Sequence, residues 1–415
     1  MINKYDVLIV GGGAAGFFSA INLSIKHSEL KIAILERSKE VLSKVRISGG
    51  GRCNVTHAEF IPKELSKKYP RGEKELLGPF HTFMTGDTIA WFEERGVQLK
   101  IEEDGRMFPD IDSSETIISC FLKEASDHNI TILKNHSVKD FGYNSAFAKA
   151  SSSKETSYYI NTSKGVFNSK YLIVTTGSSP KMWNVLEKFG HTITPAVPSL
   201  FTFNIKDQRI EGLMGLATEV AVKVVGSSLK SEGPLLITHW GMSGPAILKL
   251  SAWGARVLSD LHYQFELQIN WRQFYTADET LEELLELKNT FPKQSLYTYA
   301  QLELPKRLWQ RMLQTVHINK ELKWADVTKK ELRLLSIALT ESRFKVNGKS
   351  TFKDEFVTAG GVDLKEIQFK TFESKVCPNL YLAGEVLNID AITGGFNFQN
   401  AWTGGYIIAQ SITEV

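Results

Sequence analysis

The chain has 415 residues, of which 42% are hydrophobic and 23% charged, a composition typical of a globular protein with one large domain and at least one more. Its formal net charge of +3 and pI near 8.5 give no reason to expect a nucleic-acid partner, and no stripe of Lys and Arg alternates with aromatic residues. No apolar run reaches the length of a membrane span and no signal peptide precedes the first predicted strand, so the sequence predicts a cytoplasmic protein without a membrane partner.

The segment Tyr5–Gly16, YDVLIVGGGAAG, predicts the start of a dinucleotide-binding fold. Its apolar run is typical of a strand buried on both faces, and apolar residues at helical spacing follow the glycines. Gly11 allows a tight turn, Gly13 lets backbone N–H groups approach a pyrophosphate, and Gly16 lets the helix pack close to the strand. The helix N-terminus supplies the positive partial charge that suits a diphosphate. An ordinary strand–helix turn without a ligand is the alternative.

A second predicted strand, Lys31–Leu35, ends in Glu36, 25 residues after Gly11. An acid near this offset binds a ribose hydroxyl in dinucleotide folds and disfavours a 2′-phosphate, which indicates FAD or NAD. The next stretch, Lys44–Thr56 (KVRISGGGRCNVT), predicts a loop whose backbone lies flat against a ligand while its side chains meet anionic oxygens. A mobile surface loop without a ligand is the alternative.

Periodicity and turn residues predict the following elements. We expect a helix at 85–97 and a second helix capped by Ser113 or Ser114. Strands follow: a short parallel strand at 129–133, an antiparallel meander at 138–174, and a strand at 171–177 that returns to the parallel sheet. The composition shifts at Pro195 and Pro198, and alternation typical of strands runs from Leu200 to about Asp260, interrupted by THWGMSGPAIL. A charged helical layer extends from 280 to about 339, and its charge is most simply a solvated face rather than a partner surface.

The C-terminal segment returns to strands and glycines. VTAGGV at 357–362 is expected to form a turn, NLYLAGE a strand that ends at Gly384 and Glu385, and a closing helix begins near Gly395. A carboxylate at the strand end suits a ribityl hydroxyl, and a helix N-terminus suits the pyrimidine side of an isoalloxazine. Glu385 capping a turn is the alternative. We therefore expect one discontinuous sheet domain that binds a flavin.

Five stretches carry a resemblance over nearly the whole chain: YDVLIVGGGAAG, ISGGGRCN, THWGMSGPAIL, TAGGV and GEVLNIDAITGGFNFQNAW. Together they resemble the bacterial NAD(P)/FAD-dependent oxidoreductases of the aminoacetone oxidase and dehydro-bile-acid reductase type. The resemblance implies an α/β fold: a discontinuous Rossmann-like FAD domain at 1–195 and 353–415, an inserted β-barrel at 196–270 and 340–352, and a helical insert at 271–339. The chain departs from the family pattern at Ser178, Asn388 and Ala391, and the last two put the substrate and reaction subtype in doubt.

The motifs and the resemblance together give the set of residues expected to line FAD. They are Gly11, Gly13, Ala14, Ala15, Gly16, Glu36, Arg37, Arg46, Ser48, Gly49, Gly50, Arg52, Asn54, Val138, Gly177, Gly384, Glu385, Gly395, Asn397 and Phe398.

The sequence favours a flavin reductase that transfers a hydride through flavin N5 to an unsaturated or carbonyl small molecule, bound between the FAD domain and the barrel. No second GxGxxG is present, so NAD(P)H would dock transiently. An oxygen-using oxidase of a small amine is one alternative. A redox-sensing or binding module without turnover, with the helical insert as its partner surface, is another. The oligomeric state stays open.

No catalytic side chain is assigned. His239 precedes a glycine turn and is either an acid–base group or, more simply, structural. Cys53 has an arginine beside it that could lower its pKa, but no CxxC partner follows it. With Cys120 and Cys377 it makes an odd, widely spaced set, which predicts neither a disulfide framework nor a metal site.

Overall fold

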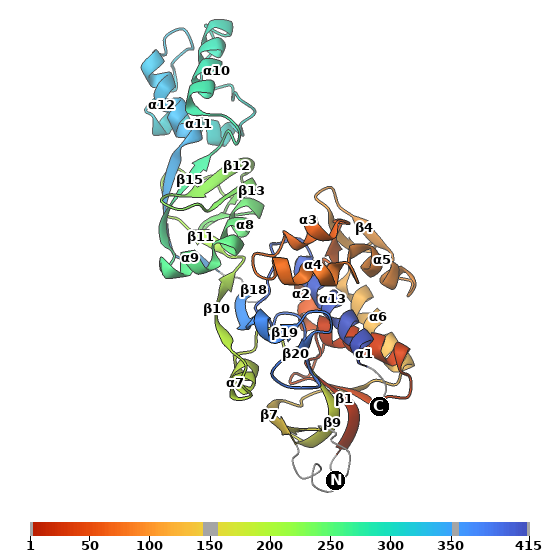
Figure 1. Ribbon diagram of the computed structural model, residues 1–415. Coiled ribbons are helices and arrows are strands. Elements are labelled where there is room, and N and C mark those ends of the chain that lie inside the picture. Colours follow the sequence, from red (N-terminus) through yellow and green to blue (C-terminus); the bar gives the residue numbers. More distant parts are fainter. Residues whose placement is uncertain (1–2, 144–156, 351–356, 413–415) are drawn as a thin grey trace. The chain divides into compact units, whose positions relative to one another are not determined.

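The computed structural model describes residues 3–143, 157–350 and 357–412, and it divides into two compact units (Figure 1). The first unit comprises residues 1–197 and 353–415, and the second comprises residues 198–352. The barrel and helical segments expected from the resemblance both belong to the second unit. None of the helices within the described ranges is long and apolar enough to cross a membrane.

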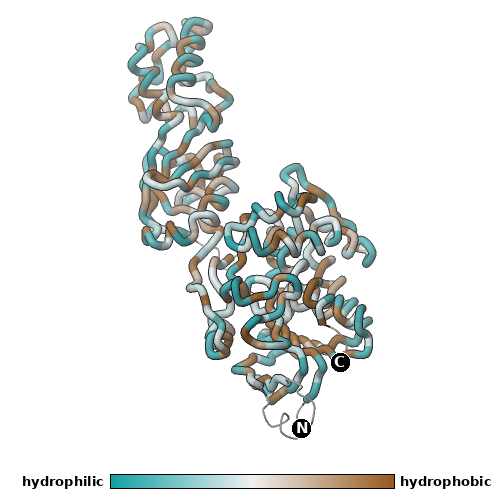
Figure 2. The backbone as a smooth tube through the Cα atoms, viewed as in Figure 1, coloured by the Kyte–Doolittle hydropathy of each residue, from teal (hydrophilic) through white to brown (hydrophobic). Residues whose placement is uncertain are grey.

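The first unit is organised around a mixed sheet of nine strands with β1 (Asn3–Val10) at its centre. β1 pairs in parallel with β2 (Ile32–Leu35) on one side and with β9 (Gly165–Val174) on the other. Residues Val7–Val10 are almost completely buried, as is typical of a central strand in a parallel sheet. Hydrophobic residues accordingly run along these strands in Figure 2.

Two helices from opposite ends of the chain pack together on this sheet: α1 (Ala14–Lys26) and α13 (Phe396–Ser411). Close approach depends on glycine, because a Cβ on Gly405 would lie 3.1 Å from the carbonyl oxygen of Ala15. β21 (Leu380–Leu382) enters the same sheet parallel to β9. The C-terminal segment therefore completes the N-terminal domain, as the sequence predicts.

The expected meander is present as β7 (Val138–Tyr143), β8 (Tyr158–Thr162) and β9, which pair antiparallel in that order. The expected turn at VTAGGV is wrong, because these residues form strand β18 (Val357–Val362), which pairs with β10 (Ile193–Ser199). Its glycines serve close backbone contact: a Cβ on Gly360 would lie 2.7 Å from the Cα of Ala196.

The other elements of the first unit are α2 (Ser43–Gly51), β3 (Thr56–His57), α3 (Pro62–Ser66), α4 (Glu73–Phe80), α5 (Thr85–Glu93), β4 (Leu99–Ile101), β5 (Arg106–Pro109), α6 (Ser114–Asp127), β6 (Thr131–Leu133), α7 (Pro180–Lys188), β19 (Ile367–Gln368) and β20 (Glu373–Ser374). β6 extends the parallel sheet beside β2, and the side chain of Ser113 caps α6, both as expected.

The second unit contains a seven-stranded sheet with its own hydrophobic core. Its strands are β11 (Thr202–Asn204), β12 (Ala217–Val224), β13 (Lys230–Ile237), β14 (Gly241–Ser243), β15 (Gln264–Asn270), β16 (Ser342–Asn347) and β17 (Lys349–Ser350). The two ends of the strand order, β16 and β17, are joined through Gly348, which closes the sheet as a barrel.

Helices of the second unit are α8 (Pro245–Trp253), α9 (Ala255–Asp260), α10 (Ala277–Thr290), α11 (Lys306–Thr315) and α12 (Lys329–Thr340). α10 and α12 each begin with a capping box, Thr276 with Glu279 and Thr328 with Glu331. These local signals agree with the helical layer expected from the sequence.

Candidate flavin site

A hollow lies at the carboxyl ends of β1 and β2, where open α/β sheets bind nucleotides. It brings together four of the expected residues, Gly11, Glu36, Arg37 and Val138. The rest of its lining is Val10, Leu35, His136, Ser137, Thr176, Ser179, Lys181 and Met182. Its mixture of an acid, cations and apolar side chains is suited to an adenosine with a negatively charged tail.

The glycines of the first motif have two different functions. Gly11 has φ +115°, and a Cβ there would lie 2.5 Å from the carbonyl oxygen of Thr175. A Cβ on Gly16 would lie 2.1 Å from the carbonyl oxygen of Gly11, so both residues are required by the fold. Gly13 has φ −97° and no atom within 4 Å of its Cβ position. It therefore leaves space at the N-terminus of α1, which carries no side-chain cap.

Glu36 is fixed beside this turn by two backbone donors. The N–H of Gly12 donates to Oε2 at 2.9 Å, and the N–H of Ser38 donates to Oε1 at 2.8 Å. Each carboxylate oxygen keeps a further lone pair for a hydroxyl donor. This arrangement fits the ribose contact expected from the sequence.

The glycine-rich segment starts as helix α2 rather than as the loop expected over the whole of 44–56. The helix kinks at Ser48, which has extended backbone, and Gly49 to Gly51 adopt positive φ. Gly49 packs under Phe108, whereas Gly50 and Gly51 have no atom within 4 Å of their Cβ positions. These two glycines expose backbone to open space, as a cofactor cradle requires.

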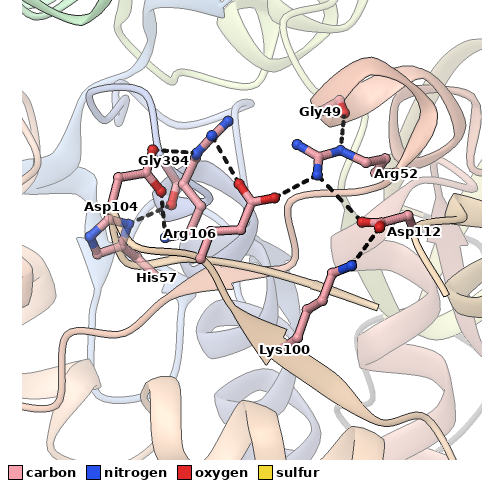
Figure 3. Close-up of polar contacts among 9 residues, drawn as sticks. Gly49, Arg52, His57, Lys100, Asp104, Arg106, Asp112 and Gly394 are labelled. Atoms are coloured by element: carbon pink, nitrogen blue, oxygen red, sulfur yellow. Dashed lines mark hydrogen bonds and ion pairs between the residues drawn. The ribbon is translucent and has the colours of Figure 1, made fainter. Parts of the chain in front are cut away.

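Arg52 lies in a polar network between this segment and the β4–β5 hairpin (Figure 3). Its Nη1 donates to Glu102 at 2.6 Å, its guanidinium carbon lies 3.9 Å from the centre of the Phe108 ring, and the bond with Glu102 raises its pKa. Glu102 also accepts from Arg106 at 2.9 Å. Arg52 therefore holds the segment in place, and Arg46 likewise forms an ion pair with Glu115 at the start of α6.

Asn54 connects the glycine-rich segment to the start of α13. With its amide oriented to satisfy both sides, its oxygen accepts from the N–H of Gly395 at 3.0 Å and its nitrogen donates to the carbonyl of Thr56 at 3.0 Å. Asn397 accepts from the N–H of Ala391 at 3.0 Å, and Phe398 stacks on Trp402 with ring centres 5.5 Å apart. Asn397 thus fixes the turn before α13, whereas the Phe398 contact lies within that helix.

Glu385 lies beside residues from three other segments. Lys44 donates to its Oε2 at 2.5 Å, and a Cβ on Gly177 would lie 3.6 Å from the same oxygen. A Cβ on Gly384 would lie 3.6 Å from the Cβ of Ala15. The expected residues after β9 and β21 therefore meet at the start of α1. Lys44 was missing from the expected set, although its place at the head of KVRISGGGRCN was a signal.

The structure adds no support for His239 or Cys53 as a catalytic residue. His239 is exposed in the connection between β13 and β14 of the second unit. The Nδ1–H of His57 donates to the carbonyl oxygen of Gly394 at 3.1 Å, and burial lowers the pKa of His57. The expected lowering of the Cys53 pKa by arginine is wrong, because complete burial raises that pKa to about 12.

All three thiols are therefore expected to be unreactive in the native protein. Cys53, Cys120 and Cys377 are buried, and burial also raises the pKa of Cys120 to about 11. Because the thiolate is the nucleophile, a maleimide at neutral pH should modify none of them before unfolding and all three in guanidinium. Intact-mass measurement checks this, and rapid native labelling of Cys53 would contradict its placement.

Comparison with known proteins decides the class to which this site belongs. A family model described as HI0933-like protein Rossmann domain matches residues 5–411. The chain belongs to this family. The family consists of FAD-dependent oxidoreductases, and the open glycines, the Glu36 carboxylate and the free N-terminus of α1 fit FAD.

Three relatives of this family member match it over nearly their full lengths. Ribosomal RNA dihydrouridine synthases from Haemophilus influenzae and Escherichia coli are 29% and 28% identical, with 98% and 99% of this chain and 98% of each relative covered. A 3-dehydro-bile acid delta(4,6)-reductase from Clostridium scindens is 25% identical, with 98% of both chains covered. This bears out the resemblance to the dehydro-bile-acid reductase type.

Among solved structures, a 3-ketosteroid-delta4-(5alpha)-dehydrogenase from Rhodococcus jostii superposes with a TM-score of 0.51 at 10% identity. The match covers 99% of this chain and 96% of that one. At this identity the match shows a shared fold, and it supports the α/β architecture with a Rossmann-type domain.

Proposed function

We propose that the chain is an NAD(P)H-dependent flavin reductase that adds two hydrogens across a ring C=C bond conjugated to a carbonyl. The observation that carries the proposal is the FAD cradle formed by the open backbone at Gly13 and Gly50 together with the Glu36 and Glu385 carboxylates. When bound there, FAD supplies two-electron chemistry that accepts a hydride from a nicotinamide and delivers it to carbon. A proton from solvent or an acid completes the addition.

The residues of the first unit bind and orient the cofactor in this proposal. The N-terminus of α1 and Gly13 receive the diphosphate, and Glu36 accepts from ribose hydroxyls. Lys44 and Glu385 hold one another at the side of the site nearest Gly177. The N-terminus of α13, turned by Gly395 at φ +92°, offers positive potential to the pyrimidine part of a flavin.

Uridine in ribosomal RNA is the substrate that we propose first. Dihydrouridine differs from uridine by two hydrogens across a ring C=C bond that is conjugated to a carbonyl, and a delta(4,6)-reductase saturates conjugated C=C bonds in a ring ketone. The activities for which the relatives are named therefore share one type of reaction. The two dihydrouridine synthases have the higher identities, which favours RNA over the small molecule expected from the sequence. A small cyclic enone is the second candidate, favoured by the bile-acid reductase.

The test follows two half-reactions: reduction of the flavin by a nicotinamide, and reoxidation of the flavin by the substrate. Mixing the purified protein anaerobically with NADPH and then NADH should bleach the visible flavin band, and unmodified ribosomal RNA should then restore the colour and gain two hydrogens on uridine by nucleoside mass spectrometry. Restoration by a steroidal enone but not by RNA would move the substrate to the second candidate. Absence of bleaching with either donor would contradict the reductase and favour an oxygen-using oxidase.

A further inference from the structure

The segment from Leu304 to Lys330 has a charge excess that the flavin site does not use. It contains seven Lys and Arg residues against two acidic residues, Glu321 and Asp326. Lys306 and Arg307 occupy the first turn of α11, which holds no acidic residue. The helix macrodipole disfavours cations at that end, so helix stability does not explain this placement.

The surrounding contacts gather these cations on one face. The side chains of Gln310 and Gln314 donate to the carbonyl and the hydroxyl of Tyr297, each at 3.1 Å. Lys306 shares this helix face, because it lies four residues before Gln310. On the other side of Tyr297, the Nζ of Lys320 lies 5.4 Å from the centre of its ring.

The loop after α11 adds another cation to the same place. Ser295 forms an isolated bridge with Lys323, and its hydroxyl donates to the carbonyl of Lys320 at 3.3 Å. Tyr299, two residues beyond Tyr297, has 56% of its surface exposed. We call the surface formed by Lys306, Lys320, Lys323, Tyr297 and Tyr299 the basic face.

The cations of the basic face differ from others in the same helical layer. Arg272 pairs with Glu283 at 2.6 Å, and Arg333 pairs with Asp278. Within the part of the chain that the structure describes, no carboxylate forms an ion pair with Lys306, Lys320 or Lys323. Unneutralised cations beside amides and aromatic rings are the chemistry that contacts phosphates, sugars and unstacked bases.

We propose that the basic face binds the sugar–phosphate backbone of the RNA substrate, an inference that rests on the proposed function. The expectation of a merely solvated face does not account for unpaired cations set at a helix N-terminus and around a tyrosine. Contacts of this kind give affinity and position without reading the base sequence. Because they are made between charged groups, the binding that they add depends strongly on salt.

The test compares two variants with the same loss of charge. The first is K306Q/K320Q/K323Q, and the control is K74Q/K123Q/K188Q, which removes three exposed lysines of the first unit. Fluorescence anisotropy with a fluorescein-labelled ribosomal RNA stem–loop gives the affinity over a series of salt concentrations. The first variant should bind about tenfold or more weakly at low salt, with the slope of log K against log salt reduced by about three, whereas the control should change little.

The outcomes separate this inference from the proposed function. Equal losses in both variants, or no RNA binding by the wild-type protein, would overturn the basic face as an RNA site. Wild-type sedimentation with phosphatidylserine vesicles, lost in the first variant while RNA binding is kept, would assign the face to a membrane instead. If RNA binds through this face but its uridines are never reduced, the proposed reaction fails and the binding surface stands.

Discussion

The variant Gly13→Asp is expected to fold normally and to be isolated without its flavin. Gly13 has a negative φ and an empty Cβ position, so an L-residue fits there without backbone strain. An aspartate at that point would place a negative charge at the N-terminus of α1, where we propose that the diphosphate binds, and like charges repel at close range. We expect FAD affinity to fall by at least about 100-fold, equivalent to about 3 kcal/mol.

The measurements are the visible absorbance of the purified protein, the dissociation constant for added FAD, and far-ultraviolet circular dichroism to check the fold. Gly86→Asp is the matched control, because Gly86 also lies at the start of a helix, α5, with no atom within 4 Å of its Cβ position. Retention of stoichiometric FAD by Gly13→Asp would show that the diphosphate binds elsewhere. A substitution at Gly11 would not serve, since it would strain the fold itself.

Sequence patterns predicted those elements of the first unit whose structure is determined by residues close together in the chain. The strand β1, the turn at Gly11 and the helix α1 follow from an apolar run and three glycines, and β2 ends at Leu35, directly before Glu36. The discontinuous sheet was also predictable, because NLYLAGE has the composition of a buried parallel strand and Gly395 marks the start of α13.

Other features depend on contacts between segments that are distant in sequence. VTAGGV looked like a turn because glycine is common in turns, yet Gly360 is needed for the close approach of β18 to the backbone of Ala196. Complete burial raises the pKa of Cys53, and the arginine beside it in the sequence gives no sign of that burial. The pairing of Lys44 with Glu385, 341 positions apart, has no local signal.

A second large effect is expected at Asp390, in the turn between β21 and α13. Asp390 is completely buried and forms a two-pronged ion pair with Arg71, whose side chain is 14% exposed. Asp390→Asn would leave the guanidinium largely buried without its full counter-charge. Breaking a buried pair from one side costs about 3–5 kcal/mol, and we expect the free energy of unfolding to fall by about 3 kcal/mol in urea titrations.

The matched control is Glu124→Gln, which removes the carboxylate that pairs with Arg95 at 3.0 Å; the Glu124 side chain is 15% exposed, whereas Asp390 is completely buried. It should cost less than Asp390→Asn, because water reaches the carboxylate of this pair. The double variant R71Q/D390N should recover part of the loss, because it removes the buried Arg71 charge together with the carboxylate that balances it. Equal losses for Asp390→Asn and the control would show that Arg71 is well solvated.

This pair also connects stability to the flavin site. Asp390 lies between Glu385 and Gly395, and Arg71 forms a bridge with it from the segment before α4. Loosening that turn would move both proposed flavin contacts, so FAD affinity should fall in Asp390→Asn and recover in R71Q/D390N in proportion to stability. If affinity stays low in the double variant while stability returns, then the Arg71 charge itself acts on the bound flavin, and its contribution is electrostatic rather than structural.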